Sequence, residues 1–145
     1  SQRSISMKQF FYVTFLLFFG SVAFAQETKF GIKVTEKTNL ATFSWTHRPL
    51  VIFANSPNDV NFRLQLKILS NNSDALTERD IVVLTDSDPE QQSSLRKQLR
   101  PRGFTLILIG KDGQVKLRKP FPWKVRELTR IVDKMPIRLQ EIEAQ

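Results

Sequence analysis

The sequence predicts a single α/β domain with a mixed central sheet and the element order βαβαββα. Three observations carry this prediction. Short, continuous apolar runs at 50–54, 81–84 and 104–109 are typical of strands that are buried on both faces. Prolines that follow polar capping residues mark helix starts after the first two runs. A turn at 111–113 then joins the third run to a segment of alternating polarity, which indicates a hairpin.

The first crossover is where local and topological signals disagree. Ser56-Pro57-Asn58-Asp59 supplies a capping hydroxyl, a proline for the first helical position and an acid for the first turn. From Val60 to Ile68, however, apolar and polar residues alternate, which by itself favours a strand. Parallel buried strands at 50–54 and 81–84 need a crossover connection, usually helical. We therefore predict a helix over 60–68.

The second half repeats this logic. Asp88-Pro89-Glu90-Gln91 predicts the start of a second helix, in which Leu95 and Leu99 share one face. In the strand 114–119, Val115 and Leu117 are expected to point inward and Lys116 and Arg118 outward. The last helix has an apolar stripe of Val125, Leu128, Val132 and Met135, and it is interrupted by Pro136.

The N-terminal region predicts export. Met7-Lys8, the apolar run 10–19 and Ala23-Phe24-Ala25 form the pattern of a signal peptide over residues 7–25. Residues 1–6 are then an upstream extension or a cloning remnant. Residues 26–39 form a leader segment, either a short edge strand or a flexible lead, and 40–144 form the domain. The expected location is periplasmic or extracellular, with no membrane span after the signal is removed.

The element order is the thioredoxin arrangement, and four spaced motifs resemble one family with that fold. The motif residues are Arg48, Pro49, Leu50, Arg79, Asp80, Gly110, Lys111, Asp112, Gly113, Met135, Pro136 and Arg138, with Glu141 beyond them. They resemble the DUDES family, the domain of unknown function 4174, over about residues 40–144. The resemblance implies a thioredoxin- or peroxiredoxin-like fold in an exported protein, with animal relatives linked to extracellular matrix, cell adhesion and polyanionic glycans.

The chain departs from working thioredoxins at the redox site. It contains no cysteine, so no thiolate can form. The position of the redox cysteines falls on Asn55, Ser56, Pro57, Asn58 and Asp59, and the position of the usual cis-proline falls on Phe104. The scaffold is therefore expected without its thiol chemistry.

No catalytic, cofactor-binding or metal-ligating residue is predicted. His47 is the one histidine and has no cysteine to join it as a zinc ligand. Asp80, Asp86 and Asp88 are expected near the C-terminal end of the second strand, where ligands bind in open α/β sheets. Acids that bound a strand or cap a helix explain the same pattern.

Charge is the remaining signal. Residues 96–138 carry thirteen Lys or Arg residues and three acids, a net charge of +10, within a chain of net charge +8. The cations at the end of the second helix (Arg96, Lys97, Arg100 and Arg102) are also explained by the helix dipole. The residues predicted to bind anions are Lys116, Arg118, Lys124, Arg126, Arg130, Lys134 and Arg138.

These observations favour an exported, non-catalytic binding module for anionic glycans or other envelope polyanions. Two alternatives stay open. One is an oxidoreductase-like enzyme without cysteine, acting at the first strand–helix turn through Ser56, Asp59 and Arg48. The other is an envelope scaffold with an unknown protein partner. Export makes nucleic acid an unexpected ligand.

Overall fold

The computed structural model describes residues 30–145. The predicted signal peptide at 7–25, the residues before it and the first residues of the leader segment lie outside the described residues. Within residues 30–145, no helix is both long enough and apolar enough to cross a membrane.

A five-stranded mixed sheet forms the centre of the domain, with the strand order β1-β3-β2-β4-β5. The strands β1, β2 and β3 are parallel to one another. The strand β4 is antiparallel to β2, and β5 is antiparallel to β4, with which it forms the terminal hairpin. This arrangement confirms the predicted α/β class and the mixed sheet. The strands are β1 (Ile32–Lys33), β2 (Arg48–Phe53), β3 (Ile81–Asp86), β4 (Thr105–Ile109) and β5 (Val115–Lys119).

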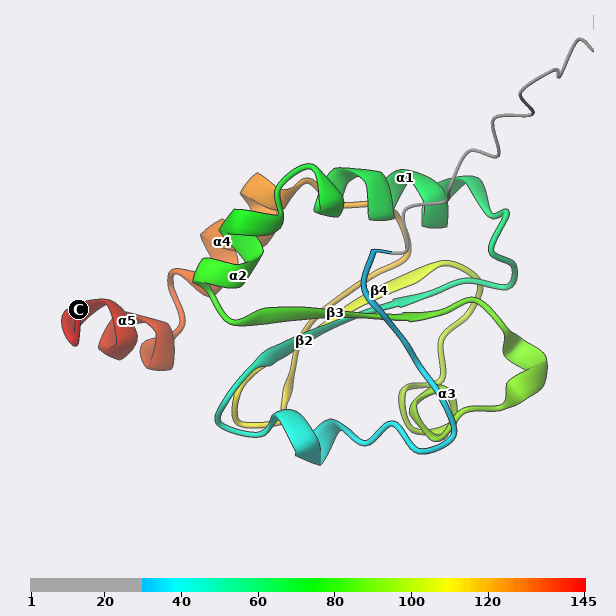
Figure 1. Cartoon of the computed structure of the whole chain (residues 1–145), viewed down its shortest axis with the longest axis horizontal. Coiled ribbons are helices and arrows are strands. Elements are labelled where there is room, and N and C mark those ends of the chain that lie inside the picture. Colours follow the sequence, from blue (N-terminus) through cyan, green and yellow to red (C-terminus); the bar gives the residue numbers. More distant parts are fainter. Residues whose placement is uncertain (1–29) are drawn as a thin grey trace, which may run out of the picture.

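Helices cover both faces of the sheet, as Figure 1 shows. The helices α1, α2 and α4 lie on one face, and α3 lies on the other together with the short 3-10 helix η1. The helix α5 extends from one end of the sheet. The helices are η1 (Leu40–Phe43), α1 (Val60–Ser70), α2 (Ser73–Glu78), η2 (Pro89–Gln91), α3 (Ser94–Leu99), α4 (Val125–Val132) and α5 (Pro136–Glu143).

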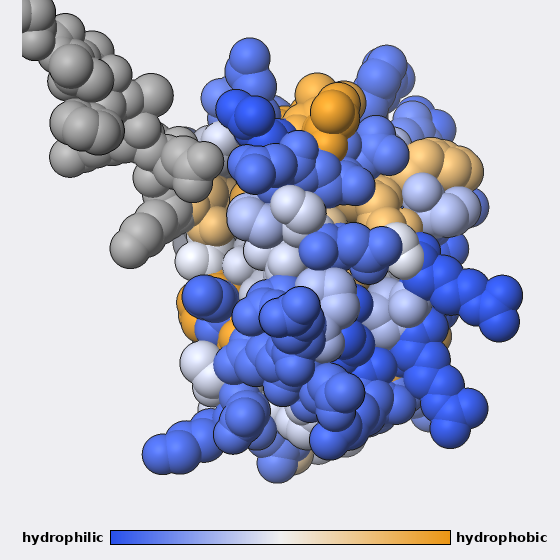
Figure 2. Space-filling model, turned by 90° about the vertical axis from the view of Figure 1, so that its right-hand side faces the viewer, coloured by the Kyte–Doolittle hydropathy of each residue, from blue (hydrophilic) through white to orange (hydrophobic). Residues whose placement is uncertain are grey.

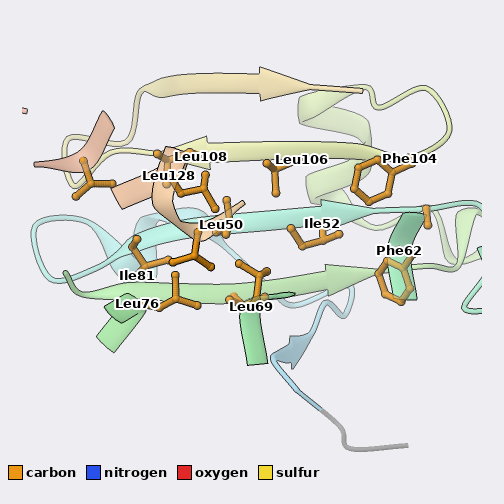
Figure 3. Packing of buried hydrophobic residues seen from close by; sticks show 14 residues of the cluster. Leu50, Ile52, Phe62, Leu69, Leu76, Ile81, Phe104, Leu106, Leu108 and Leu128 are labelled. Atoms are coloured by element: carbon orange, nitrogen blue, oxygen red, sulfur yellow. The ribbon is translucent and has the colours of Figure 1, made fainter. Parts of the chain in front are cut away.

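Two apolar clusters hold these layers together. Leu50 and Ile52 of β2 point into a first cluster with Leu69 of α1 and Leu128 of α4 (Figure 3). Val51, between them, points the other way into a second cluster under α3. Because both faces are covered, β2 is fully buried and reads as a continuous apolar run. Each such side chain contributes about 1.5–3 kcal/mol on burial.

The predicted crossover helix is confirmed as α1. Its buried positions are Phe62, Gln65 and Leu69, which follow helical spacing, whereas Val60 is 78% exposed and Leu64 47%. Gln65 is fully buried because its side-chain amide bonds both backbone groups of Trp123, at 2.9 and 2.7 Å. A polar residue at a core position therefore hid the helical period in the sequence.

The predicted helix starts are wrong in detail. Ser56 does not cap α1; Asp59 does, since its Oδ1 accepts from the Phe62 N–H at 2.9 Å. The Ser56 hydroxyl accepts from the Asn58 N–H in the preceding turn. Asp88-Pro89 starts only the short η2, which ends where Gln92 adopts φ +46°. Ser93 then caps α3 separately, because its hydroxyl accepts from the Arg96 N–H.

The structure agrees with the edge-strand alternative for the leader segment and changes two further predictions. Part of the leader segment forms β1, which pairs with β3 as an edge strand. Val115 was predicted to point inward but is 48% exposed, so only Leu117 of that pair reaches the core. Pro136 was predicted to interrupt the last helix, but α4 already ends at Val132. Pro136 instead occupies the first turn of α5, where its missing N–H costs nothing.

Candidate functional site

The N-terminal ends of β2 and β3 carry a buried ionic network, which we call the motif end. The Arg48 side chain is 1% exposed and donates to both Glu141 carboxylate oxygens, at 3.1 and 3.2 Å. It also donates to the Arg79 carbonyl at 2.8 Å. Lys111 bonds Asp80 at 2.8 Å and shares Glu141 with Arg48. These contacts fix α5 to the sheet, since Glu141 lies on that helix.

Arg79 and Arg138 extend the same network. Arg79 forms a bidentate ion pair with Asp133, with both N···O distances at 2.9 Å. Arg138 is 3% exposed and lies within 4.0 Å of three carboxylates, those of Glu78, Asp133 and Glu141. Arg138 was predicted to bind anions from an exposed face, and its burial removes it from that set.

The network shifts the pKa values of its members in the directions expected of ion pairs. The hydrogen bond from Arg79 holds the pKa of Asp133 below its usual value, and the same bond raises the pKa of Arg79. For Glu141, partial burial acts to raise the pKa, but hydrogen bonds from Lys111 and Arg48 outweigh it and lower the pKa. Glu141 and Asp133 are therefore held in the charged form.

The family-motif residues converge on this end. Arg48, Arg79, Asp80, Lys111 and Arg138 are all members of the network, although they come from four separate segments. The glycines of the motif build the turn beside it. A Cβ on Gly110 would lie 2.5 Å from Lys116 and 2.6 Å from Asp112, whose ion pair spans the turn at 2.8 Å. Gly113 adopts φ +80°, which favours glycine.

The bond from Lys116 also lowers the pKa of Asp112. Pro49 and Leu50 are buried in β2, and Met135 and Pro136 lie at the start of α5. The ion pairs and hydrogen bonds of the motif residues thus hold α5 against the sheet.

The opposite end of the sheet corresponds to the redox site of thioredoxins, and we call it the redox-equivalent end. Figure 2 looks onto the side of the molecule that holds it, which is mostly hydrophilic. Ser56 and Asp59 are engaged in the turn and cap already described, and Phe104 is packed in the first apolar cluster. Residues 30–145 contain no cis peptide bond.

The residues of the enzyme alternative do not come together. Arg48 starts β2, whereas Ser56 and Asp59 follow its far end. A six-residue strand is about 20 Å long at roughly 3.3 Å per residue. The arrangement of Ser56, Asp59 and Arg48 in one site is therefore wrong.

A buried polar cluster fills the space behind the redox-equivalent end. Asp86 is 3% exposed and accepts from the Ser93 hydroxyl at 2.5 Å and from Arg96 at 3.0 Å. The same Arg96 nitrogen donates to the Ala54 and Asp86 carbonyls, each at 3.1 Å. The Arg96 guanidinium also lies 5.2 Å from the centre of the Phe53 ring. This cluster ties α3 to the ends of β2 and β3.

The predicted grouping of acids is therefore wrong. Asp80 lies before β3 at the motif end, and Asp86 closes β3 at the other end. Nowhere in residues 30–145 do three His, Asp or Glu side chains gather as possible ligands of a metal ion. His47 is exposed in the loop before β2, with its ring edge-on to Phe43 at 6.2 Å.

A pocket of about 710 Å³ opens beside the redox-equivalent end, on the α3 side of β5. Three of its lining side chains are arginines, and none is acidic. We call it the arginine pocket. It is lined by Gln98, Leu99, Arg100, Arg102, Thr105, Arg118 and Pro120.

The structure divides the basic residues of 96–138 into two groups. Five have a carboxylate within 4.0 Å: Arg96, Lys111, Lys116, Arg130 and Arg138. Eight have no carboxylate that close among the described residues: Lys97, Arg100, Arg102, Arg118, Lys119, Lys124, Arg126 and Lys134. Of the predicted binding set, Arg118, Lys124, Arg126 and Lys134 belong to the unpaired group.

Comparison with known proteins agrees with the fold and the motif. The family model described as "Domain of unknown function (DUF4174)" matches residues 39–141. The chain belongs to this family. The predicted resemblance is thereby confirmed. The matched region contains strands β2 to β5, both helical layers and most of α5, whereas β1 lies before it.

Solved structures similar to this DUF4174 domain are thioredoxins and peroxiredoxins. A 2-Cys peroxiredoxin of Plasmodium vivax is 17% identical with a TM-score of 0.55, covering 74% of this chain and 86% of the other. A chloroplastic thioredoxin z is 22% identical with a TM-score of 0.55, covering 80% and 96%. A desulfothioredoxin of Desulfovibrio vulgaris Hildenborough is 21% identical with a TM-score of 0.52, covering 72% and 97%. At such identities the likeness establishes a thioredoxin-like fold and nothing about activity.

Proposed function

We propose that this DUF4174 domain is a non-catalytic binding module for anionic polymers. The observation that supports it is the group of eight cations in 96–138 that have no carboxylate within 4.0 Å among the described residues. Every buried cation of the motif end has acidic partners, so the domain neutralises charge where burial requires it. The unpaired cations are available to an external anion.

Some of the unpaired cations lie on β5, the edge strand of the sheet, or follow it closely in the chain. Arg118 points toward α3, where it bonds the Leu99 carbonyl, and Lys119 lies on the opposite side, 4.9 Å from the Trp123 ring. Lys124 and Arg126 follow at the start of α4 and are exposed. Cations on both sides of an uncovered edge suit a linear polyanion better than a small, enclosed ligand.

The class of polymer follows from the expected compartment. A signal peptide at 7–25 would deliver the domain to the periplasm or the outside of the cell, where acidic polysaccharides and envelope polymers are the abundant polyanions. We therefore propose an anionic glycan or envelope polymer as the partner. A scaffold that binds a protein is the competing function, and the same experiment separates the two.

Heparin serves as the test polymer. The variant Lys124→Glu/Arg126→Glu reverses two unpaired cations of this surface, and Lys33→Glu/Lys37→Glu makes the same charge change on exposed residues of the N-terminal region. We expect the first variant to elute from a heparin column at clearly lower salt than the second. The wild-type affinity should fall linearly with salt on a log–log plot, because binding releases counterions.

Equal elution of the two variants, with both folded by circular dichroism, would show that only net charge matters. Failure of the wild type to bind heparin or any acidic glycan at low salt would overturn the proposed function and favour the protein-binding scaffold.

A further inference from the structure

We propose that the arginine pocket is the selective subsite of this surface and holds one tetrahedral oxyanion, a sulfate or phosphate ester group carried by the polymer. This inference rests on the proposed function and makes it specific. The surrounding basic surface would hold a chain of charges, whereas the pocket would recognise one chemical group. Its volume of about 710 Å³ is within the usual range for pockets that hold small ligands.

Three arginines from three different parts of the chain line the pocket. Arg100 follows α3, Arg102 lies in the loop before β4, and Arg118 lies on β5. No lining residue is an acid. The other polar residues of the lining are Gln98 and Thr105, which are neutral. The pocket therefore presents only positive and neutral groups to a ligand.

The backbone that carries these arginines is held in place by its own contacts. The Arg100 N–H donates to the Arg96 carbonyl at 2.9 Å, with Arg100 at φ +49°. Pro101 lies between Arg100 and Arg102, and its ring fixes its own φ angle. The Thr105 hydroxyl donates to the Arg102 carbonyl at 3.3 Å. Arg118 donates to the Leu99 carbonyl at 2.6 Å, which fixes its guanidinium group and leaves its other donors for a ligand. Such preorganisation lowers the entropy lost on binding.

The position of one of the three arginines, Arg118, can be explained by its role in stabilising the fold. Arg118 satisfies a carbonyl in the last turn of α3, and a cation there also complements the helix dipole. Arg100 and Arg102 are exposed and form no hydrogen bond through their side chains among the described residues, so capping does not account for them. Three like charges around one pocket repel each other, and a bound anion removes that repulsion.

The tetrahedral geometry distinguishes the expected group from a carboxylate. A guanidinium group offers a planar fork of donors that pairs with two oxygens at a time. A carboxylate has two oxygens that lie in one plane, so the donors that pair with it best approach within that plane. A sulfate or phosphate ester has three terminal oxygens and can accept from several arginines at once. We therefore expect the pocket to prefer these esters over uronic acids.

The test compares three monosaccharides, which are too small to span the basic surface. Glucose 6-sulfate, glucose 6-phosphate and glucuronic acid are titrated into the full chain at low salt and followed by NMR. We expect at least one ester to bind about tenfold more tightly than glucuronic acid, which corresponds to about 1.4 kcal/mol. Preference for the sulfate ester identifies a sulfated glycan, and preference for the phosphate ester identifies a phosphate-containing polymer; either result supports the pocket.

Matched variants locate the binding. Arg100→Asn/Arg102→Gln removes two pocket charges, and asparagine tolerates the left-handed backbone at position 100. Lys33→Gln/Lys37→Gln removes the same charge from exposed residues of the N-terminal region that do not line the pocket. We expect a loss of about tenfold or more in ester affinity for the first pair and less than about twofold for the second. Arg118→Lys keeps the charge but loses the fork, and it should also weaken ester binding.

Equal losses in the two pairs, equal affinity for glucuronic acid, or no ester binding by the wild type would overturn the pocket. Heparin retention, measured in parallel on the same proteins, separates this inference from the proposed function. Wild type that binds heparin but not the esters refutes the pocket alone, whereas wild type that binds neither refutes both.

Discussion

The two ends of the sheet hold their positive charges in opposite ways. At the motif end, Arg48, Lys111 and Arg138 are buried, and each lies within hydrogen-bond distance of Glu141. Beside the redox-equivalent end, Arg100, Arg102 and Arg118 are exposed around a pocket without an acid. Removing a charge from water costs several kcal/mol, so a buried cation needs a carboxylate and an exposed one does not. The first group therefore serves the fold, and the second is available for binding.

This comparison explains why net charge is an unreliable guide to a binding surface. The net charge of +10 in residues 96–138 is partly neutralised in the folded domain by ion pairs with acids outside the segment, among them Asp80, Asp86 and Glu141. The residues that matter for binding are the ones that this neutralisation leaves out. The following predictions test whether the two ends differ in the way described.

The largest expected effect is on stability at the motif end. We expect Arg48→Met to lower the free energy of unfolding by about 3 kcal/mol, because it removes the donor to the Arg79 carbonyl and two charged hydrogen bonds to Glu141. The matched change Arg102→Met should alter it by less than about 0.5 kcal/mol, since that side chain is exposed. Urea unfolding of both variants measures the difference. Similar losses in the two variants would mean that the ends are not distinct.

The second prediction concerns the pH dependence of the same network. Glu141→Gln should cost about 2 kcal/mol at pH 7, because hydrogen bonds from Arg48 and Lys111 to a charged acceptor are lost. The pKa of Glu141 is lower in the folded protein than in the unfolded chain. Its stabilising contribution is therefore complete above the unfolded pKa, about 4.3, and is lost as pH falls through the lower folded pKa.

The difference between wild type and Glu141→Gln should accordingly shrink as the pH is lowered from about 5 to 3. The exposed Glu143, changed to Gln, serves as the control and should give a small difference at every pH. A difference for Glu141→Gln that is the same at both ends of this range would contradict the ionic role of Glu141.

A smaller effect is expected at the redox-equivalent end. Asp59→Ala should lower stability by about 1 kcal/mol, the usual value of a helix cap. Ser56→Ala should change it by less than about 0.5 kcal/mol, since its hydroxyl accepts one bond in an exposed turn. Thermal unfolding of both variants tests this order. The reverse order would restore Ser56 as the cap.

The smallest expected effect is none at all. Because the chain has no thiol, we expect no reduction of insulin disulfides and no turnover of hydrogen peroxide above a heat-treated control. Activity that survives purification to homogeneity and disappears on heating would mean that the redox-equivalent end has chemistry of another kind.

Particular elements show how far the sequence could be interpreted. The strands β2, β3 and β4 were predictable because burial on both faces leaves an uninterrupted apolar run. The helix α1 was predictable only through topology, since the buried Gln65 breaks its apolar period. The helix α5 was missed because Pro136 was interpreted as a stop signal. A proline followed by seven residues without another breaker also fits a helix start, and that signal was present.

The motif end and the arginine pocket also differ in how far the sequence predicted them. The motif residues were identified from the sequence, but their joint role was not, because Arg48 and Glu141 are 93 positions apart. The arginine pocket was missed because Arg100 and Arg102 were interpreted as the charged end of a helix, although Arg118 was predicted to bind anions. No local pattern places Arg118 beside Leu99; the hairpin of β4 and β5 does so.

The sequence by itself determined the fold class and the absence of thiol chemistry, because both depend on composition and on patterns within short segments. Only the tertiary structure decided which cations are neutralised. Whether a cation meets a carboxylate depends on side chains that folding brings together from distant segments, and on how far water is excluded where they meet. Positively charged residues therefore form buried ion pairs that hold α5 at one end of the sheet, and they line an open, basic pocket at the other end.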